Sequence, residues 1–394
     1  MHSGPRLLFL FEDLDISGTH HVALNLVERA SSNGYHCRML ICMNDRIGDS
    51  SHDERFILPP RILGQSEALL SKFLKFLVLL WTAPKLARHT DLLIATCPAS
   101  SLIGAWASLL SRKPLLGWVH YDVRGRQREV AGMGRGWIVD ILQNWLYYLF
   151  MPRLESLIFV SETARVSMRK AAGRKVSSQR WIVLPNLYQR SLLQAKSSSL
   201  DRLLDLKATG KPIVLFIGRL AFQKRWIHAI QAAEALDDMG VVANWVFIGD
   251  GPDRHSFLSA LQGSPLAQHL HWLGLDPNPL PVFKHVDALV LTSLYEAWPT
   301  VILEAFDQRL PVVSYDCPSG PREMLGNQKR GWLTEENPQR IAVALAEIFG
   351  PNGADIAKQR SQAAQEYLRQ FDPEIAFSQW DKTFRKILRR HHRI

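Results

Sequence analysis

The stretch DALVLTSLYEAWPTVILEA, from Asp287 to Ala305, decides the fold of this chain. Its first seven residues form a short, mostly apolar run, which is typical of a strand buried on both faces of a parallel sheet. Pro299 then stands where the first helical position is expected, and the residues after it continue at helical spacing. A buried strand that leads directly into a helix is the repeating unit of an open α/β sheet.

Two carboxylates stand eight positions apart in this stretch, and they are the first candidate site residues. The pattern puts Glu296 in the loop at the carboxyl end of the strand and Glu304 about two turns into the helix. Ligands of open α/β sheets bind at that edge. Carboxylates accept hydrogen bonds from sugar hydroxyls, and backbone N–H groups at a helix start favour an anion. The spacing alone fits an amphipathic helix with two ordinary surface glutamates equally well.

A second segment, PIVLFIGRLAFQKRW, reads as a buried strand that ends at Gly218. Glycine permits close approach of the backbone to a ligand, and Arg219 and Lys224 follow in or near the next turn. Two cations beside such a turn would neutralise a diphosphate, although a solvated basic turn is the alternative. A third strand with a Gly-rich turn, NWVFIGDGPDR, runs from Asn244 to Arg254.

Apolar runs alternate with helical patterns along the whole chain, which predicts parallel, doubly wound sheets. The expected strands of the first half are RLLFLFE, HCRMLIC, DLLIATC, LLGWVH, SLIFVS and RWIVLP, and those of the second half are IVLFIG, NWVFIG, LHWLG, ALVLTS and PVVSYD. At 394 residues the chain suits two domains. We expect them at 1–186 and 211–372, with a polar, Ser-rich linker at 187–210 and a last helix at 373–394.

The net charge of +10 lies almost entirely in the first half, where residues 1–190 carry 24 Lys and Arg against 15 Asp and Glu. A basic balance suits an anionic membrane surface, nucleic acid or a phosphorylated substrate. The apolar stretches Ala68–Ala83 and Gly136–Met151 are too short and too interrupted by charge to span a membrane. They are either interfacial helices or core helices, and the composition does not separate the two.

Four cysteines, Cys37, Cys42, Cys97 and Cys317, show no CxxC pairing and no zinc pattern, which favours a reducing compartment. The apolar run at the amino terminus ends after six residues and suits a first strand better than a secretory signal. We therefore expect a cytoplasmic location. No nucleic-acid-binding motif is present, so nucleic acid is not an expected partner.

In this order and spacing, the segments GRLAFQK, IGDGPDR, SLYEAWPTVILEA and DCPSGPREML resemble the carboxyl-terminal domain of the retaining, sugar-nucleotide-dependent glycosyltransferases of group 1, or family 4. The resemblance is strong over residues 211–335 and covers only a few positions of the first half. It implies the GT-B architecture, in which two Rossmann-like domains face a cleft and the last helix returns to the first domain. It also implies transfer of a hexose or N-acetylhexosamine from a nucleotide sugar.

The resemblance further implies a role for several residues of the second half. Arg219 and Lys224 would stabilise the leaving diphosphate, together with the helix start at Pro299, Thr300 and Val301, and Gly218 would let the donor approach. Glu304 would accept from the ribose hydroxyls, and Glu296 would orient the transferred sugar. The base is expected near Trp272 to Gly274, including Leu273. Ser319 and Gly320 could place backbone groups near the sugar, and Glu323 would stand at a helix start.

In the first half, the resemblance singles out fewer positions. His120 matches a family histidine near the donor sugar and is counted among the catalytic candidates. Gly18 matches the second glycine of a Gly-Gly loop, whose first glycine is replaced by Ser17. Ala297 is a second departure, because the family usually has glycine there, and a positive φ would strain it. Ser161 and Asn186 match further family positions, and the arginines at 124, 126 and 128 form either an acceptor-phosphate site or a solvated loop.

No cofactor and no metal are expected, since protein cations would replace Mg²⁺ at the diphosphate. The one Asp-x-Asp, Asp13-Leu14-Asp15, is the alternative metal site, but its pattern arises easily by chance. The favoured hypothesis is a metal-independent, retaining hexosyltransferase that uses a nucleotide sugar, expected to be a UDP-sugar. Its acceptor would be a lipid-linked or polysaccharide glycan at the inner membrane face. The alternatives are a GT-B epimerase or phosphorylase, and a basic membrane-surface binding protein with a vestigial donor site.

Overall fold

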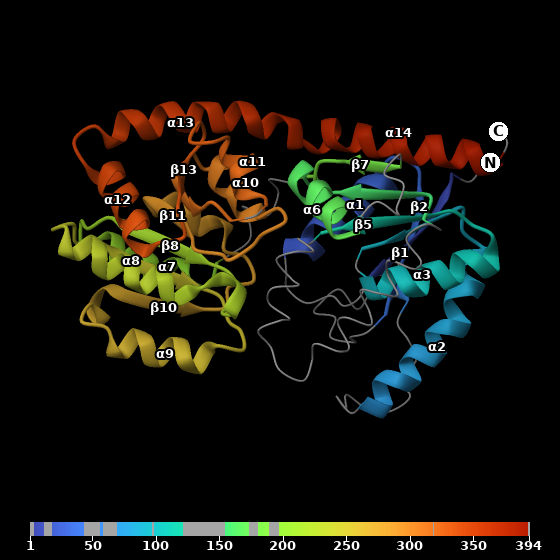
Figure 1. Ribbon diagram of the computed structural model, residues 1–394, viewed down its shortest axis with the longest axis horizontal. Coiled ribbons are helices and arrows are strands. Elements are labelled where there is room, and N and C mark those ends of the chain that lie inside the picture. Colours follow the sequence, from blue (N-terminus) through green and yellow to red (C-terminus); the bar gives the residue numbers. More distant parts are fainter. Residues whose placement is uncertain are drawn as a thin grey trace. The chain divides into compact units, whose positions relative to one another are not determined.

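The computed structural model describes residues 4–11, 18–42, 56–57, 69–96, 98–120, 154–172, 180–188, 197–317 and 319–392. The chain divides into two compact units. Unit 1 comprises Met1–Val123, Val130–Tyr188 and Phe371–Ile394, and unit 2 comprises Arg124–Glu129 and Gln189–Gln370. The chain therefore returns to unit 1 after it has completed unit 2 (Figure 1).

Unit 1 contains a seven-stranded sheet in the order β3-β2-β1-β4-β5-β6-β7, and every pair of neighbours is parallel. Its central strands are buried on both faces, as their continuous apolar sequences predict. The strands are β1 (Arg6–Phe11), β2 (His36–Ile41), β3 (Phe56–Ile57), β4 (Leu92–Ala95), β5 (Leu115–Val119), β6 (Ser156–Phe159) and β7 (Trp181–Val183).

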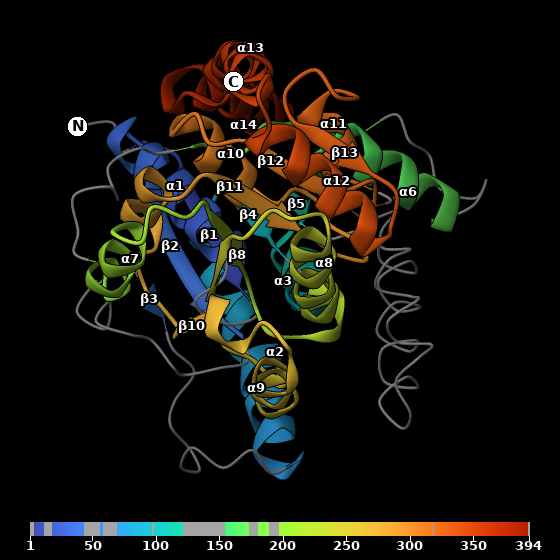
Figure 2. The same cartoon turned by 90° about the vertical axis from the view of Figure 1, so that its left-hand side faces the viewer.

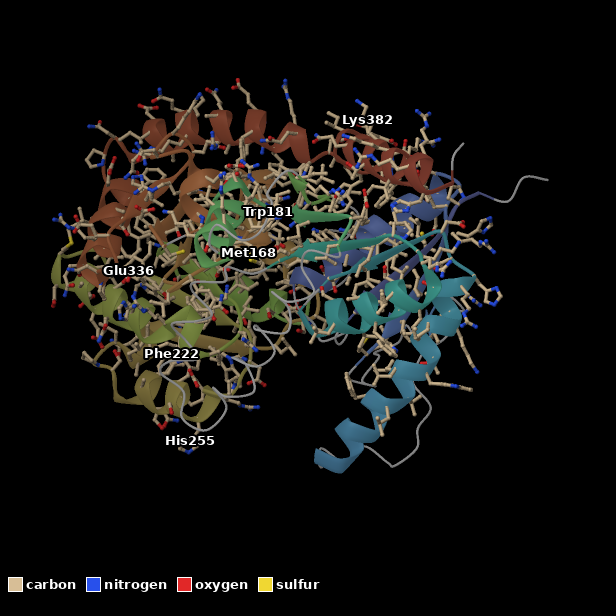
Figure 3. The ribbon with its side chains drawn as sticks, turned by 45° about the vertical axis from the view of Figure 1, so that its right-hand side comes forward. Met168, Trp181, Phe222, His255, Glu336 and Lys382 are labelled. Atoms are coloured by element: carbon tan, nitrogen blue, oxygen red, sulfur yellow. The ribbon has the colours of Figure 1, made fainter. Side chains whose placement is uncertain are left out.

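Helices cover both faces of this sheet. On one face, α2 (Leu69–Arg88), α3 (Pro98–Ser111) and α6 (Glu162–Ala172) bury apolar side chains against the strands. Met168 of α6 and Trp181 of β7 belong to the same core cluster and are labelled in Figure 3. The other face carries α1 (Gly18–Ser32) and the last helix, α14 (Pro373–His392), which contact each other.

Helix α14 is anchored in unit 1 by aromatic packing and by polar contacts. Trp380 is fully buried, and its ring lies 4.6 Å from that of Trp118 in an edge-on arrangement. The Trp380 indole N–H donates to the carbonyl of Pro185 at 3.0 Å. The Tyr35 hydroxyl donates to Asp381 at 2.6 Å. These contacts make the last twenty described residues part of the first core.

Unit 2 contains a six-stranded parallel sheet in the order β10-β9-β8-β11-β12-β13. The reversal of strand order between β8 and β11 is the topological switch point at which open α/β sheets bind ligands. The strands are β8 (Ile213–Ile217), β9 (Asn244–Ile248), β10 (Leu270–Gly274), β11 (Ala288–Leu291), β12 (Val312–Tyr315) and β13 (Trp332–Thr334).

Figure 2 shows this sheet with helices on both of its sides. The helices α8 (Trp226–Asp238), α9 (Arg254–Gly263) and α12 (Pro338–Phe349) share one core cluster with the strands. The remaining elements are α7 (Leu200–Lys207), α10 (Thr300–Asp307), α11 (Pro321–Leu325), α13 (Gly353–Leu368) and the short 3₁₀ helices η5 (Phe222–Lys224), η6 (Ala267–His269), η7 (Leu280–His285) and η8 (Arg369–Phe371).

The α/β class with two doubly wound parallel sheets is confirmed, and all eleven expected strands are present. The strands β3 and β13 were not predicted, because two or three residues carry too little pattern. The expected linker 187–210 contains helix α7, which packs on η7 and buries Leu203. Among the described residues, no helix is both long enough and apolar enough to cross a membrane.

Candidate functional site

The candidate site lies at the carboxyl edge of the unit 2 sheet, where the loops after β8, β11 and β12 follow three neighbouring strands. Gly218 directly follows β8 and has a φ of +153°, which L side chains rarely adopt. A Cβ atom there would lie 3.1 Å from Cε of Lys224. The absence of a side chain at Gly218 therefore lets Lys224 lie directly against the backbone at the strand end.

Lys224 and Glu296, which are separated by 72 residues in the sequence, form an ion pair in this site. Nζ of Lys224 lies 2.5 Å from Oε1 of Glu296, and their side chains are 19% and 9% exposed. The same carboxylate oxygen accepts a hydrogen bond from Ser293 Oγ at 2.7 Å. Because little water reaches the pair, the attraction is stronger than at an open surface. The two contacts fix the orientation of the carboxylate and keep a cation beside it.

The loops after β8 and β11 are tied together by backbone contacts as well. The Thr292 hydroxyl lies 2.9 Å from the carbonyl oxygen of Lys224 and 3.1 Å from that of Arg225, and donates toward both. The backbone N–H of Leu294 donates to the carbonyl of Gln223 at 2.8 Å. Thr292 is fully buried, so these carbonyls are satisfied by the protein. The backbone that carries Lys224 is therefore held from the opposite loop.

Arg225, which separates η5 from α8, has the left-handed conformation with φ 45° and ψ 46°. Such a conformation is uncommon for a residue with a side chain and is found preferentially at functional sites. Its guanidinium Nη1 lies 2.9 Å from Oε2 of Glu336, which follows β13 and is labelled in Figure 3. This ion pair secures the turn that directs Lys224 toward Glu296.

The loop after β12 supports the Glu296 loop from its other side. Ser319 Oγ donates a hydrogen bond to the main-chain carbonyl of Glu296. Gly320 has a φ of +75°, and a Cβ atom there would lie 2.8 Å from Cδ of Pro299 and 3.0 Å from the carbonyl oxygen of Ala297. Ser319 and Gly320, expected beside a sugar, thus contact the loop that carries Glu296. Ala297 does not have the positive φ that would strain it.

Helix α10 carries the second glutamate and begins at Thr300, so Pro299 is the cap residue and not the first helical residue as expected. The N–H groups of the first turn have no acceptors within a helix, so those of Thr300 and Val301 are available to an anion. Glu304 is the fifth residue of α10, in its second turn and not two full turns in. Burial of the carboxyl group raises the pKa of Glu304 to about 7, and a hydrogen bond with Thr300 opposes this shift.

Two other expected donor residues lie on the same unit. Arg219 is exposed and has no ion-pair partner among the residues that the structure describes. Leu273 lies on the edge strand β10, where the register against β9 shifts between Trp272 and Gly274. The irregularity leaves Leu273 without a Cα partner in that register. The indole of Trp272 fixes this turn by donating to the carbonyl of Gly249 at 2.9 Å.

Family models match both halves of the chain. Residues 205–367 match "Glycosyl transferases group 1" and residues 16–189 match "Glycosyltransferase Family 4". The chain belongs to the glycosyltransferase family of the group 1 and family 4 type. The recognition made on GRLAFQK, IGDGPDR, SLYEAWPTVILEA and DCPSGPREML is therefore confirmed.

Solved structures place this glycosyltransferase in the GT-B fold. Sucrose-phosphate synthase from Thermosynechococcus elongatus superposes with a TM-score of 0.81 at 16% identity, over 97% of this chain and 99% of that one. The Anabaena protein HepE in complex with UDP-glucose superposes with a TM-score of 0.76 at 18% identity, over 97% and 99% of the two chains. At these identities the likeness concerns the fold alone.

Curated relatives match over shorter lengths. An exopolysaccharide phosphotransferase of Streptomyces coelicolor is 27% identical over 304 residues, which are 76% of this chain and 29% of that protein. A lipopolysaccharide 1,6-galactosyltransferase of Salmonella typhimurium is 35% identical over 125 residues, which are 29% of this chain and 33% of that protein. The glycosyltransferase thus spans about a third or less of the length of these two relatives.

The expected residues of the first half that the structure describes, His120, Gly18, Ser161 and Asn186, belong to unit 1, which is described separately from the unit 2 site. His120 follows β5 and lies against Trp118, with 4.1 Å between the ring centroids. Gly18 is the first residue of α1. Ser161 and Asn186 are buried. Asp13, Asp15, Ser17 and the arginines at 124, 126 and 128 lie outside the described residues, as does Cys97.

Within the described part of the chain, no group of three or more His, Cys, Asp or Glu side chains could hold a metal ion.

Three polar residues of the glycosyltransferase site were not singled out as partners of the charged pair. Ser293 lies three residues before Glu296 and donates to its carboxylate, Thr292 holds the Lys224 loop, and Ser319 holds the main chain of Glu296. The short separation of Ser293 and Glu296 in the sequence is the signal that could have found this contact. The contacts of Thr292 and Ser319 join separate loops, so no local pattern signals them.

Proposed function

We propose that this glycosyltransferase moves a hexose or an N-acetylhexosamine from a UDP-sugar to a glycan or lipid-linked acceptor, with retention of configuration and without a metal ion. The observation that carries the proposal is the Lys224–Glu296 pair, held by Ser293 beside Gly218 at the switch point of the unit 2 sheet. A cation fixed at a strand end where a glycine opens the backbone suits a diphosphate.

In the proposed reaction, the C–O bond between the sugar and the diphosphate breaks while a bond to the acceptor oxygen forms on the same face. The leaving diphosphate gains negative charge and takes the proton of the acceptor hydroxyl, so no protein nucleophile is needed. Lys224 and the exposed Arg219 stabilise that charge, together with the N–H groups of Thr300 and Val301. Arg219 suits bidentate contact with phosphate oxygens, whereas Lys224 acts as a point charge.

The two glutamates would divide the recognition of the donor. Glu296, fixed by Lys224 and Ser293, would orient the transferred sugar. Glu304, on the adjoining helix, would accept hydrogen bonds from the ribose hydroxyls. The backbone of Leu273 would contact the base. His120 and Gly18 belong to unit 1, and their expected roles toward the donor stay predictions.

Known proteins of related sequence or fold support the donor and acceptor classes. HepE binds UDP-glucose, and the Salmonella relative is a lipopolysaccharide galactosyltransferase. We therefore propose a role in bacterial surface-glycan synthesis, and the cytoplasmic location stays a prediction from the sequence.

The test is calorimetric titration of the purified chain with UDP, GDP and ADP in EDTA, repeated with Glu304→Gln and with the exposed-site control Glu335→Gln. Micromolar binding of UDP in EDTA that is strongly weakened in Glu304→Gln and kept in Glu335→Gln is the expected result. Binding only after Mg²⁺ is restored would overturn metal independence and direct attention to Asp13 and Asp15. Turnover of a UDP-sugar without an acceptor would favour an epimerase.

A further inference from the structure

Exposed apolar side chains gather on two adjacent helices of unit 1. Among the described residues, fifteen large hydrophobic side chains are exposed, and six of them lie on α2 and α3. Isolated exposed apolar side chains are ordinary, whereas their concentration on neighbouring elements marks an interaction surface. The six are Phe76, Leu77, Trp81, Trp106, Leu109 and Leu110, here called the α2–α3 surface.

The side chains of the α2–α3 surface come from helix faces that point away from the core. On α2, Leu79, Ala83 and Ala87 recur every four residues and are fully buried in the core cluster that α2 shares with α3 and the strands. Leu77 and Trp81 have the same spacing on another face, and Trp81 is 65% exposed. The outward face of α2 is thus apolar where a surface helix normally carries polar residues.

A hydrogen bond shows that the apolar residues of the two helices adjoin. The indole N–H of Trp106, on α3, donates to the carbonyl of Leu80 at 2.9 Å, one residue before Trp81. Leu109 and Leu110 follow Trp106 by three and four positions, so they continue its face of α3. The helices pack side by side (Figure 1). The six exposed residues therefore lie on two helices that contact each other next to Trp81 and Trp106.

The charge of these helices has a single sign. The sequences of α2 and α3 contain Lys72, Lys75, Lys85 and Arg88 and not one Asp or Glu. Nζ of Lys85 lies 3.0 Å from the centroid of the Trp81 ring. Arg112 is exposed directly after α3. An apolar surface with Trp, on two helices that carry basic and no acidic residues, is complementary to a bilayer with anionic headgroups.

We propose that the α2–α3 surface binds the face of a lipid bilayer that contains anionic lipid. Its leucines and Phe76 would enter the boundary between headgroups and acyl chains, and its tryptophans would lie at headgroup level. Lys85, Arg88 and Arg112 would contact lipid phosphates. The helices would lie in the interface. The inference is independent of the proposed glycosyl transfer, because the surface needs neither donor nor acceptor.

Two other occupants fit less well. A second copy of the chain in a symmetric dimer would bring the same basic helices together, with no acidic residue on either helix to balance the charge. A protein partner would have to cover lysines, which are depleted at protein interfaces. Both alternatives are distinguished by the experiment below.

The test is co-sedimentation of the full chain with vesicles of phosphatidylcholine, alone or mixed with phosphatidylglycerol. The variants are Trp81→Ser with Leu109→Ser, and Lys85→Glu with Arg88→Glu. The control is Met239→Ser with Val242→Ser, which removes two exposed apolar side chains from unit 2. We expect wild type and control to bind the anionic vesicles, and the apolar variant to lose about tenfold or more in partitioning. The charge-reversed variant should lose the preference for anionic lipid and the sensitivity to salt.

Absence of wild-type binding to anionic vesicles at low salt would overturn the proposal, as would equal binding of the wild type and the apolar variant. A wild-type dimer that the apolar variant abolishes, with vesicle binding unchanged, would assign the surface to a second copy of the chain. Thermal unfolding checks that each variant is folded. If the apolar variant is not, Leu77→Gln with Leu110→Gln repeats the test on the same surface with smaller changes.

Discussion

The loop after β11 and the helix α10 that follows it each carry one glutamate, and the two carboxylates are held in opposite ways. Glu296 accepts from Lys224 and Ser293, so its negative charge is compensated before any ligand arrives. Glu304 is subject mainly to burial, which raises its pKa to about 7. Two residues that look equivalent in the sequence thus differ in what they lack. The charge of Glu296 is already compensated by partners within the protein. The charge of Glu304 would be stabilised further by hydrogen bonds from a ligand.

Removal of Lys224, the cation that is paired with Glu296, should have the largest effect on activity and stability. Lys224→Met leaves the Glu296 carboxylate almost buried with only Ser293 beside it, and it removes the charge proposed for the diphosphate. We expect kcat/KM to fall about a thousandfold and the free energy of unfolding to fall by about 3 kcal/mol. Steady-state kinetics and urea unfolding measure the two losses.

A second variant separates the two roles of Lys224. Lys224→Met combined with Glu296→Gln removes both charges, so it should recover most of the lost stability without recovering activity. Activity of Lys224→Met within tenfold of wild type would contradict the proposed role of the lysine.

The affinity for the donor should depend on pH through Glu304, because the pKa of Glu304, about 7, lies in the accessible range. Since the ionised carboxylate is the better acceptor for ribose hydroxyls, affinity should rise with pH, by about tenfold between pH 6 and pH 8. UDP-glucose is the suitable ligand, since its diphosphate carries no group that titrates there. Glu304→Gln should bind roughly 10- to 100-fold more weakly and show no pH dependence.

The same titration with Glu335→Gln should retain the wild-type pH dependence, because Glu335 lies on the exposed surface of unit 2. An unchanged pH profile in Glu304→Gln would show that another group titrates. It would contradict the proposal that Glu304, unlike Glu296, makes binding depend on pH.

A change in the loop after β12, which supports the loop that carries Glu296, should affect Glu296 and not Glu304. In Gly320→Ala, the new methyl group meets Pro299 Cδ at 2.8 Å and forces a residue with a side chain to a φ of +75°. We expect a loss of about 2 kcal/mol in the free energy of unfolding. Gly240→Ala, at a φ of +80° with open space around it, provides the control for the conformational part. Equal losses in both variants would show that contact with the Glu296 loop does not matter.

Loss of a single hydroxyl should have the smallest effect. Ser293→Ala leaves the Lys224–Glu296 ion pair but removes the second donor to Glu296 Oε1. We expect kcat to fall about fivefold, which corresponds to about 1 kcal/mol, with the affinity for UDP unchanged. A fall in affinity in place of a fall in kcat would place Glu296 at the nucleotide and not at the sugar.

The sequence predicted the sheets well because their strands are continuous apolar runs such as IVLFIG and ALVLTS, and burial of both faces demands that composition. It missed β13, whose three residues pair only because β12 is already present. The prediction also placed Pro299 one residue too deep in α10, since proline is compatible with both positions.

The candidate site was predicted residue by residue, but not as a set of contacts. Gly218, Lys224, Glu296 and Glu304 were each selected from a local motif. That Lys224 contacts Glu296 depends on the adjacency of β8 and β11, which a linear pattern does not encode. The raised pKa of Glu304 likewise results from surroundings that only the folded unit creates.

The manner in which α14 completes unit 1 has a consequence for the order of events during synthesis on the ribosome. The rings of Tyr35 and Trp118 pack on Phe384 and Trp380, residues made after all of unit 2. The first core therefore stays uncovered on that face while nearly two hundred further residues emerge. A chain that ended before Pro373 would contain every strand of both sheets but would lack the helix that covers one face of the first sheet, so the half translated first is completed last.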